Sequence, residues 1–406
     1  MTTAATTPSG RTASAPRTPL RGRLAVVSVM LGIFSIVTTE ILPIGLLTSI
    51  GSDFAVSDGV AGLLLTLPGA LAAVSAPAVT VATARVDRRV MLGGFMLLLA
   101  LADFLTAAAT DYRLLLAARV LVGITIGGFW SVGAGLAERL VRPDSVGRAT
   151  AVIFSAVPLG SVLGVPAGTF IGGLAGWRTA FVVMGALTAG VLALMLLVLP
   201  PLPPTRVTRG SLLRTVLGRS GTRFALLITF LIVLSHFATY TYVTPFLEQV
   251  THAGPAVITV FLLVYGAAGI VGNFLGGSLV ARRPLTATAL AAGSIAAATT
   301  LLPALGRWQT GAVALLVVWG MAYGAVPVCS QAWFARAAPG TPEAASVLFT
   351  ASFQATFAIG ALTGGAVLDH LSVSAVMRLG GVVAAAGVIV VALTGTRSGR
   401  LGTRRG

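Results

Sequence analysis

Hydrophobic and polar positions follow each other along this chain in long blocks. Twelve apolar stretches, each close to the roughly 20 residues that span a bilayer as a helix, are separated by short segments that carry most of the arginines. These stretches and their connections account for nearly all of the 406 residues. The pattern predicts an all-α membrane protein with twelve transmembrane helices and little chain left for a soluble catalytic domain.

Charge clusters and Gly/Pro turns mark the ends of the predicted helices. The predicted helices cover 24–49, 60–84, 90–110, 113–138, 148–174 and 178–200, then 222–250, 257–280, 285–305, 310–335, 343–367 and 372–395. The corresponding units are a disordered cytoplasmic tail at 1–23, a six-helix bundle at 24–200, a cytoplasmic central loop at 201–221, a second six-helix bundle at 222–395 and a cytoplasmic tail at 396–406. Within the last tail, disorder is expected over Ser398–Gly406.

Two arginine signals recur in the two halves of the chain. Arg88 and Arg89 follow the second predicted helix, and Arg282 and Arg283 follow the eighth, 194 residues later. Arg139 and Arg336 end the fourth and tenth helices, 197 residues apart. The repetition predicts two pseudo-symmetric six-helix bundles that face each other across a midplane site, as in rocker-type secondary transporters.

Composition supports a lipid environment, since 56% of the residues are hydrophobic and only 9% are charged. The formal net charge of +16 comes from arginines in loops, with no aromatic-interleaved basic patch, so nucleic-acid binding is not expected. All 27 basic residues are arginine, which excludes the lysine of a phosphate-binding loop, and Cys329, the single cysteine, excludes an internal disulfide. No metal or other cofactor is expected.

The arginines also predict orientation, because cytoplasmic loops retain positive charge. With the amino terminus inside, 22 arginines fall on the cytoplasmic side and three outside. We expect a multi-pass protein of the inner membrane with both termini in the cytoplasm.

Several motifs narrow the family. They are Thr38–Pro43 in the first helix, Arg119 with Gly123 in the fourth, Leu163–Gly168 before Gly176-Trp177-Arg178, and Ser235–Tyr242 with Pro245 and Phe246 in the seventh. On these residues the chain resembles the major facilitator superfamily over all twelve helices. It resembles most the drug and sugar proton-antiporter branch, with its arabinose-type sugar efflux permeases and chloramphenicol exporters. The resemblance implies a monomer that exchanges protons for substrate by alternating access.

The family's gating motif departs from its usual form in the loop after the second helix. Arg85, Arg88 and Arg89 keep the basic part, whereas Ala84 and Asp87 replace an aspartate and a glycine. In the fifth helix, Gly164, Pro166 and Gly168 form the expected gating motif, with Val165 inserted. Because glycines recur there at every fourth position, we expect this helix and Gly360, Gly364 and Gly365 of the eleventh to form the seam between the halves.

Charged groups inside the predicted spans are the candidates for proton coupling, because such groups are costly in a membrane. Glu40 is placed about 15 Å deep, and Arg119 and Asp103 about 10 Å deep, by their positions along their helices. An Arg119–Asp103 ion pair is therefore geometrically plausible, and the resemblance associates the fourth-helix arginine with proton movement. The alternatives are a glutamate that only fixes helix packing and a static buried pair.

Polar and aromatic residues within the spans are the candidates for substrate binding. The seventh helix places His236 and Tyr240 four positions apart on one face, with Thr239 beside them. Further lining candidates are Trp130, Ser131, Asn273, Gln331, Gln354 and Phe357. The alternative for all of them is helix packing, which is also the role expected of Tyr323 and Trp333.

The sequence thus predicts proton-coupled export of a small molecule, most simply a sugar or sugar-like compound, with protons and lipid as its other partners. A chloramphenicol or multidrug exporter is the alternative within transport. A channel or uncoupled facilitator would show no dependence on a proton gradient, and a membrane enzyme has no plausible nucleophile and base in this sequence.

Overall fold

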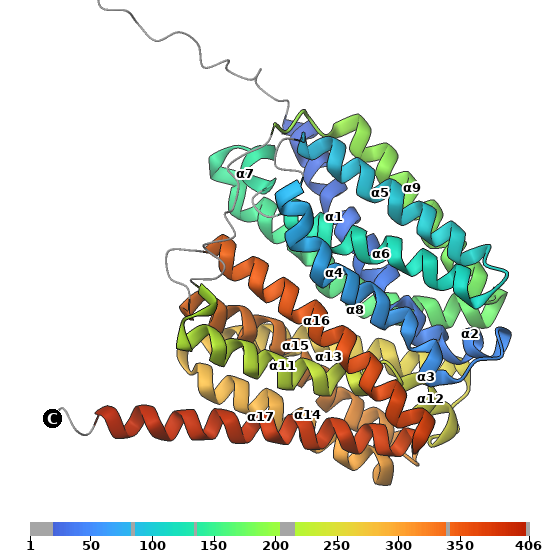
Figure 1. Ribbon diagram of the computed structural model, residues 1–406, viewed down its shortest axis with the longest axis vertical. Coiled ribbons are helices and arrows are strands. Elements are labelled where there is room, and N and C mark those ends of the chain that lie inside the picture. The colour runs from blue at the N-terminus through green and yellow to red at the C-terminus, as the bar shows by residue number, and fades with distance from the viewer. Residues whose placement is uncertain (1–18, 83–85, 134–135, 204–215, 338–341, 403–406) are drawn as a thin grey trace, which may run out of the picture.

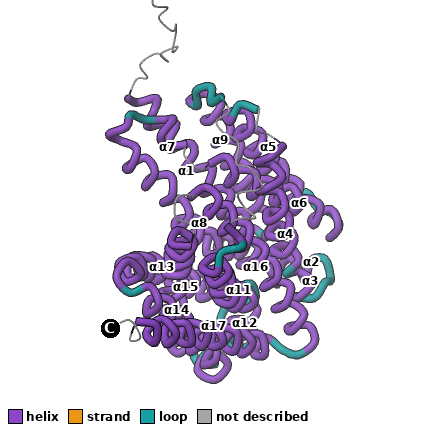
Figure 2. The backbone as a smooth tube through the Cα atoms, turned by 60° about the vertical axis from the view of Figure 1, so that its left-hand side comes forward, coloured by secondary structure: helices purple, strands orange, loops and turns teal. Residues whose placement is uncertain are grey.

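The computed structural model describes residues 19–82, 86–133, 136–203, 216–337 and 342–402. Nearly all of these residues are helical (Figure 2), which confirms the predicted all-α class. Most of the predicted tail at 1–23 and of the central loop at 201–221 lies outside the described residues.

The first half of the chain contains nine helices and two 3₁₀ turns among its described residues. These are α1 (Pro19–Ile41), η1 (Leu42–Leu46), α2 (Leu47–Asp53), α3 (Asp58–Ala61), α4 (Leu63–Ala82), α5 (Arg88–Ala107), α6 (Tyr112–Gly133), α7 (Leu136–Leu140), η2 (Pro143–Ser145), α8 (Val146–Ala175) and α9 (Trp177–Val198). We call this set the first half.

The second half has fewer interruptions. Its described helices are α11 (Ser220–Tyr240), α12 (Val243–Gln249), α13 (Pro255–Arg282), α14 (Pro284–Leu305), α15 (Gln309–Ala337), α16 (Pro342–His370) and α17 (Val373–Gly402). Within the described residues of the two halves together, twelve segments are long and apolar enough to cross a membrane, as predicted. The last helix, α17, extends to Gly402, beyond residue 395, where the twelfth predicted helix ends.

Local sequence explains where several helices begin and end. Ser57 precedes α3, and its hydroxyl accepts a hydrogen bond from the backbone N–H of Val60 at 3.1 Å. Asp87 precedes α5 and accepts from the N–H of Arg89 at 2.7 Å. Gly176 separates α8 from α9 with φ of +83°, a conformation that favours glycine.

The first spans of the two halves are built alike. The α1 helix ends at Ile41 and continues through η1, and α11 ends at Tyr240 and continues into α12 after a two-residue turn. Residues 231–247 repeat the order of buried and half-buried positions of residues 31–47. The internal repeat therefore has an offset of 200 residues here, which makes Glu40 and Tyr240 equivalent positions.

Equivalent helices also pack in equivalent ways. Within the halves, α1 packs on α8 and α11 packs on α16; between the halves, α4 packs on α16 and α8 packs on α13. The ribbons of the halves converge where α2, α3 and α12 lie and diverge toward α7 (Figure 1). We call the end with α2, α3 and α12 the closed end.

Candidate functional site

Glu40 and Gln354 connect the two halves by a buried hydrogen bond. Glu40 lies one residue before the end of α1 and is 8% exposed, and Gln354 lies in α16 and is 6% exposed. The Nε2 atom of Gln354 donates to Oε1 of Glu40 at 2.8 Å. The sequence placed these residues in separate groups, one for protons and one for substrate, and the structure brings them into direct contact.

Arg119 lies in α6, is fully buried, and donates to main-chain carbonyl oxygens. Its Nε donates to Leu64 at 2.9 Å, and its Nη2 donates to Thr39 at 3.1 Å and to Glu40 at 3.2 Å. Two of these carbonyls lack their ordinary helical donors, because the residues four positions later are Pro68 and Pro43. The guanidinium therefore satisfies backbone groups that prolines leave free at the broken end of α1 and at the start of α4.

The Arg119–Asp103 ion pair that the sequence made plausible is not formed. Within the described residues the one ion pair joins Arg178 and Asp53. Asp103 of α5, also fully buried, accepts a hydrogen bond from the Thr39 hydroxyl at 3.1 Å. The reason is that carbonyls hold the Arg119 donors, and the two side chains approach the same residue, Thr39, from different helices.

Two buried polar atoms of this cluster have no hydrogen-bond partner among the described residues. They are Oδ1 of Asp103 and Nη1 of Arg119. An unpaired buried donor or acceptor destabilises a protein by about 1–3 kcal/mol, and more if it is charged. Glu40, Asp103 and Arg119 thus form a charged cluster around Thr39 in which not every polar atom has a hydrogen-bond partner. A change in the protonation of Glu40 or Asp103 therefore changes the hydrogen bonds and the electrostatic attraction within the cluster.

The second half contributes a column of aromatic rings. His236 and Tyr240 of α11 lie with Tyr323 of α15 and Tyr265 of α13, and we call these four rings the aromatic column. The ring centroids are 3.3 Å apart for His236 and Tyr323, 5.0 Å for His236 and Tyr240, and 4.6 Å for Tyr240 and Tyr265, all with nearly parallel planes. Trp319 of α15 meets three of the rings edge-on.

Two polar atoms of this column and one of the adjacent Trp319 have no hydrogen-bond partner in the described part of the chain. The atoms concerned are Nδ1 of His236, the Tyr265 hydroxyl and Nε1 of Trp319. Tyr323 is partly exposed, whereas His236, Tyr240, Tyr265 and Trp319 are buried. Tyr323 was expected to be a packing or interfacial residue. It packs on His236 and on Phe237, and Phe237 in turn lies 5.9 Å from Phe353, the residue before Gln354.

The other predicted lining residues are more scattered. Phe357 is buried against Phe237, with ring centroids 3.9 Å apart, and so belongs to the edge of the aromatic cluster. Thr239 points its hydroxyl back to the carbonyls of Ser235 and His236, at 2.9 Å each, and Ser131 does the same to Gly128 at 2.7 Å. These two hydroxyls are therefore used within their own helices.

Trp130, Asn273 and Gln331 remain partly or fully exposed. The Trp130 ring lies 6.2 Å from that of Phe154, on α8. Among the described residues, none of the three hydrogen-bonds to Glu40 or stacks on the aromatic column, so the structure does not bring them to the same site.

The predicted gating residues of the loop before α5 make their contacts within the first half. Asp87 accepts from the N–H of Leu202 at 2.9 Å, and the N–H of Arg88 donates to the Leu202 carbonyl at 2.9 Å. Arg89 donates to the carbonyl of Leu196. Arg85 lies outside the described residues. The three described residues thus fasten the start of α5 to the end of α9.

The expectation that the α8 glycines form the seam between the halves is wrong. A Cβ on Gly160, Gly164 or Gly168 would meet Val37, Ile41 or Leu42, at 3.0, 3.1 and 2.9 Å. All three neighbours belong to the first half, and Pro166 is buried in the same helix. The glycines let α8 approach α1 closely, and spacing alone does not tell which neighbour a small-residue face meets.

The eleventh-span glycines divide between two roles. Gly360 meets α11 within its own half, whereas a Cβ on Gly365 would lie 2.8 Å from the carbonyl oxygen of Gly59. The real seam in this region therefore runs between Gly365 of α16 and the start of α3.

Hydrogen bonds from Ser57 and Gly59 to Asp369 join the two halves at the closed end, and we call this contact the Asp369 latch. Asp369, at the end of α16, accepts from the Ser57 hydroxyl at 2.8 Å and from the N–H of Gly59 at 3.1 Å. It thereby caps the first turn of α3 in the opposite half. Nearby, Nε2 of Gln249 donates to Asp58 at 3.4 Å. Sequence reasoning missed Asp369, because its partners are more than 300 residues away.

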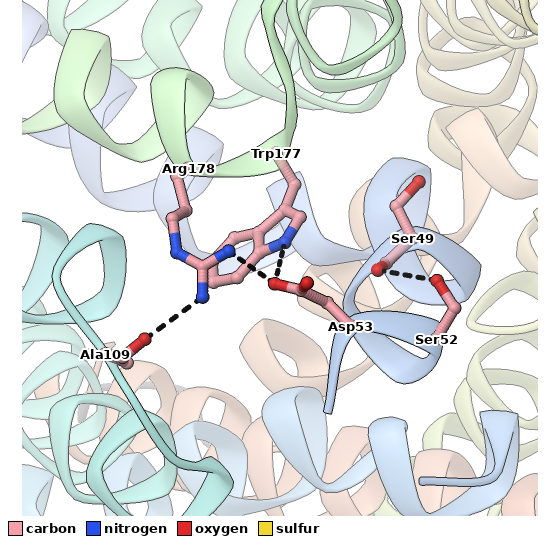
Figure 3. A network of polar contacts seen from close by, with 6 residues as sticks. All are labelled: Ser49, Ser52, Asp53, Ala109, Trp177 and Arg178. Atoms are coloured by element: carbon pink, nitrogen blue, oxygen red, sulfur yellow. Dashed lines mark hydrogen bonds and ion pairs between the residues drawn. The ribbon is translucent and has the colours of Figure 1, made fainter. Parts of the chain in front are cut away.

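A second network stabilises the first half next to this latch. Arg178 bonds to Asp53 and donates to the carbonyl of Ala109 at 3.2 Å, and Trp177 Nε1 donates to Asp53 at 3.1 Å (Figure 3). The Arg178 guanidinium carbon lies 4.3 Å from the centre of the Trp177 ring. The network ties the end of α2 to the start of α9 and so positions the segment that leads into α3.

Two similar halves, each with six membrane-spanning segments among the described residues and with buried charged and aromatic groups near their contact, are typical of a secondary transporter that works between membrane faces. The chain belongs to the major facilitator superfamily, whose family model matches residues 29–347. It is therefore a multi-pass membrane transporter for small molecules and not an enzyme.

Two curated relatives are similar to the chain over most of its length. OpdE of Pseudomonas aeruginosa, described as a transcription regulatory protein, is 33% identical over 353 residues, covering 85% of this chain and 87% of that protein. The purine ribonucleoside efflux pump NepI of Escherichia coli (strain K12) is 31% identical over 359 residues, covering 88% and 90%.

Solved structures show the same fold at low identity. A bacterial homologue of the human lysosomal transporter Spinster matches with a TM-score of 0.72 and 16% identity, over 93% of this chain and 96% of that one. The human organic anion transporter MFSD10 matches with a TM-score of 0.66 and 17% identity, over 92% and 100%.

Proposed function

We propose that the protein is a proton-coupled exporter that moves a small uncharged compound out of the cell in exchange for protons. The observation that carries this proposal is the Glu40–Gln354 hydrogen bond, because it joins a titratable group of one half to the other half at 2.8 Å. A proton on Glu40 changes that contact directly, and the contact must break when the halves move apart.

The charge state of Glu40 selects between two arrangements of the halves. As a carboxylate it accepts from the Gln354 amide, and Arg119, held on the adjacent carbonyls, stabilises its charge. Once protonated, Glu40 gains a donor and loses the attraction to the guanidinium. Neutralisation also lowers the free-energy penalty of moving this group through apolar surroundings. The change from the outward-open back to the inward-open arrangement is therefore easier with the proton bound.

Asp103 supplies a second titratable group in the same cluster. It shares Thr39 with Arg119, since the Thr39 hydroxyl donates to Asp103 and the Thr39 carbonyl accepts from Arg119. A proton on Asp103 weakens its attraction to Arg119 and so changes the group that holds the broken end of α1. We assign Glu40 to coupling and Asp103 to tuning of Arg119.

The arginine distribution supports an orientation that is compatible with export. With both termini in the cytoplasm, the closed end faces the outside and the diverging end faces the cytoplasm. The described conformation then accepts substrate from the inside, as an exporter requires, with the Asp369 latch shut on the outer side.

For the substrate we propose a sugar-bearing compound. The predicted sugar is compatible with the amide and carboxylate at the Glu40–Gln354 pair, and the name of NepI specifies a nucleoside, which contains a sugar. The name of OpdE points to a different role at similar identity, so neither name decides the matter. An exporter of chloramphenicol type is the second candidate, favoured by the aromatic column.

The test is transport by purified protein in liposomes with an imposed pH gradient. Uptake of labelled arabinose, inosine and chloramphenicol is compared. The controls are proteoliposomes without a pH gradient and liposomes without protein. Gradient-driven accumulation of a sugar or nucleoside supports the proposal. Accumulation of chloramphenicol alone moves the assignment to drug export, and equal flux with and without the gradient contradicts proton coupling.

A further inference from the structure

The partly exposed ring of Tyr323 ends a stack whose other members are buried. Its centroid lies 3.3 Å from that of His236 with planes 8° apart, and Phe237 meets it edge-on at 5.9 Å. Tyr240, Tyr265 and Trp319 support His236 from behind. A ring held in this way has its orientation fixed before anything binds, and pre-organisation reduces the entropy lost on binding.

The surroundings of Tyr323 bring a polar pair next to this ring. The Tyr323 ring meets Phe237, and Phe237 lies 5.9 Å from Phe353 of α16. Phe353 directly precedes Gln354, whose amide donates to Glu40. A flat apolar face and a hydrogen-bonding carboxylate–amide pair therefore adjoin at the level where the halves meet. A plain sugar uses only the second of these features, whereas a compound with a planar ring and attached hydroxyls uses both.

The interior of the column adds an independent sign of a ligand-binding role. Three polar atoms of the buried rings of the column and of the adjacent Trp319 have no hydrogen-bond partner among the described residues: Nδ1 of His236, the hydroxyl of Tyr265 and Nε1 of Trp319. A cluster selected only for packing would be better served by phenylalanine and leucine, because each unpaired buried polar atom is destabilising.

We propose that Tyr323 is the specificity-determining residue of the site and that it selects substrates with a planar aromatic ring by stacking on its exposed face. This rests on the proposed export function and narrows its substrate class to ring-bearing hydroxylated compounds. Glu40 and Gln354 bind the hydroxyl or amide part of the same molecule. The column behind Tyr323 keeps its ring in place, so that His236 is a positioning residue.

The test compares binding of inosine with binding of ribose, which has the same sugar and no ring. Binding to wild type, Tyr323→Phe and Tyr323→Leu is measured at equilibrium in detergent. The matched control is Phe274→Leu, which replaces an exposed aromatic residue on a different helix, α13. We expect Tyr323→Phe and Phe274→Leu to bind inosine like wild type. Tyr323→Leu should bind it on the order of tenfold more weakly, with ribose binding unchanged.

The proposal would be overturned if Tyr323→Leu weakened the binding of inosine and ribose equally, or if it left inosine binding unchanged. A second variant supplies the complementary test. Tyr323→Trp keeps a planar ring at this position and should bind inosine at least as tightly as wild type, with ribose binding unchanged. A loss of inosine binding in Tyr323→Trp equal to that in Tyr323→Leu contradicts ring stacking.

The two proposals can fail separately. Ring-dependent binding without proton-driven flux would contradict the proposed export function and still support Tyr323 as the residue that selects ring-bearing substrates. Proton-driven flux of arabinose and inosine alike, unaffected by Tyr323→Leu, would keep the exporter and reject the role of Tyr323.

Discussion

The Nη2 atom of Arg119 lies 3.1 Å from the carbonyl oxygen of Thr39, whose usual helical donor is missing because residue 43 is proline. The same side chain reaches Leu64, four positions before Pro68. One arginine thus stabilises two helix irregularities that the sequence creates, and it holds them next to Glu40.

Arg119→Lys should destabilise the fold, because an ammonium cannot replace a planar fork that reaches three carbonyls. Loss of one or two buried hydrogen bonds to a charged donor predicts a decrease of about 1.5–3 kcal/mol in the free energy of unfolding. Thermal unfolding in detergent measures it. Arg113→Lys, an exposed arginine of the same helix, is the control and should be neutral. Equal stability of the two variants would show that the carbonyl contacts contribute little.

Asp369→Asn should loosen the closed end. An asparagine has one acceptor oxygen, whereas Asp369 accepts from both Ser57 and the N–H of Gly59. We expect the population with the closed end open to increase by about tenfold, as the loss of one charge-assisted bond implies. Spin labels at Ser52 and Ser372, both exposed, report the distance between the halves. An unchanged distance distribution would mean that the latch does not hold this end.

Gly62→Ala should interfere with the same closure for a steric reason. The φ of Gly62 is −58°, which alanine adopts freely, but its Cβ would overlap the Tyr242 hydroxyl and lie 2.8 Å from Cζ. We expect destabilisation of about 1–3 kcal/mol, measured by thermal unfolding, and partial rescue by Tyr242→Phe. Gly94→Ala, with nothing within 4 Å, is the matched control. Absence of rescue would place the defect elsewhere.

Closure should also depend on pH through Glu248 of α12. Burial raises the pKa of Glu248 above its ordinary value. In the opposite half, the Thr48 hydroxyl lowers it and the negative charge of Asp58 raises it, and the net shift is upward. The closed arrangement therefore binds this proton more tightly than an opened one, so acid favours closure and the preference is lost as pH rises through the raised pKa. Glu248→Gln should flatten the pH dependence of the same spin-label distances. A slope unchanged in that variant would assign the effect to another group.

Much of the fold follows from the sequence because the spans are set by length and apolar composition. The charged cluster was also within reach, since Glu40, Arg119 and Asp103 are costly at membrane depth. Their pairing was not, because it depends on carbonyls freed by Pro43 and Pro68. The sequence does contain the relevant signal, because each proline lies four positions after the residue whose carbonyl it leaves free: Pro43 after Thr39 and Pro68 after Leu64.

Other parts of the site could not be predicted from spacing. His236 and Tyr240 share a helix face, but Tyr265 and Tyr323 come from α13 and α15, and only packing places the four rings in one column. The glycines of α8 illustrate the opposite error. Their spacing correctly indicates a close helix approach, but it does not identify α1 as the partner.

The most direct test of proton coupling separates two kinds of flux in Glu40→Gln. Liposomes preloaded with inosine exchange it for labelled inosine without net proton movement, whereas uphill accumulation requires the pH gradient. Glutamine keeps the size of Glu40 and a hydrogen-bonding amide, so exchange should continue near the wild-type rate while gradient-driven accumulation disappears. Gradient-driven accumulation at the wild-type level in Glu40→Gln would contradict the central role assigned to this residue.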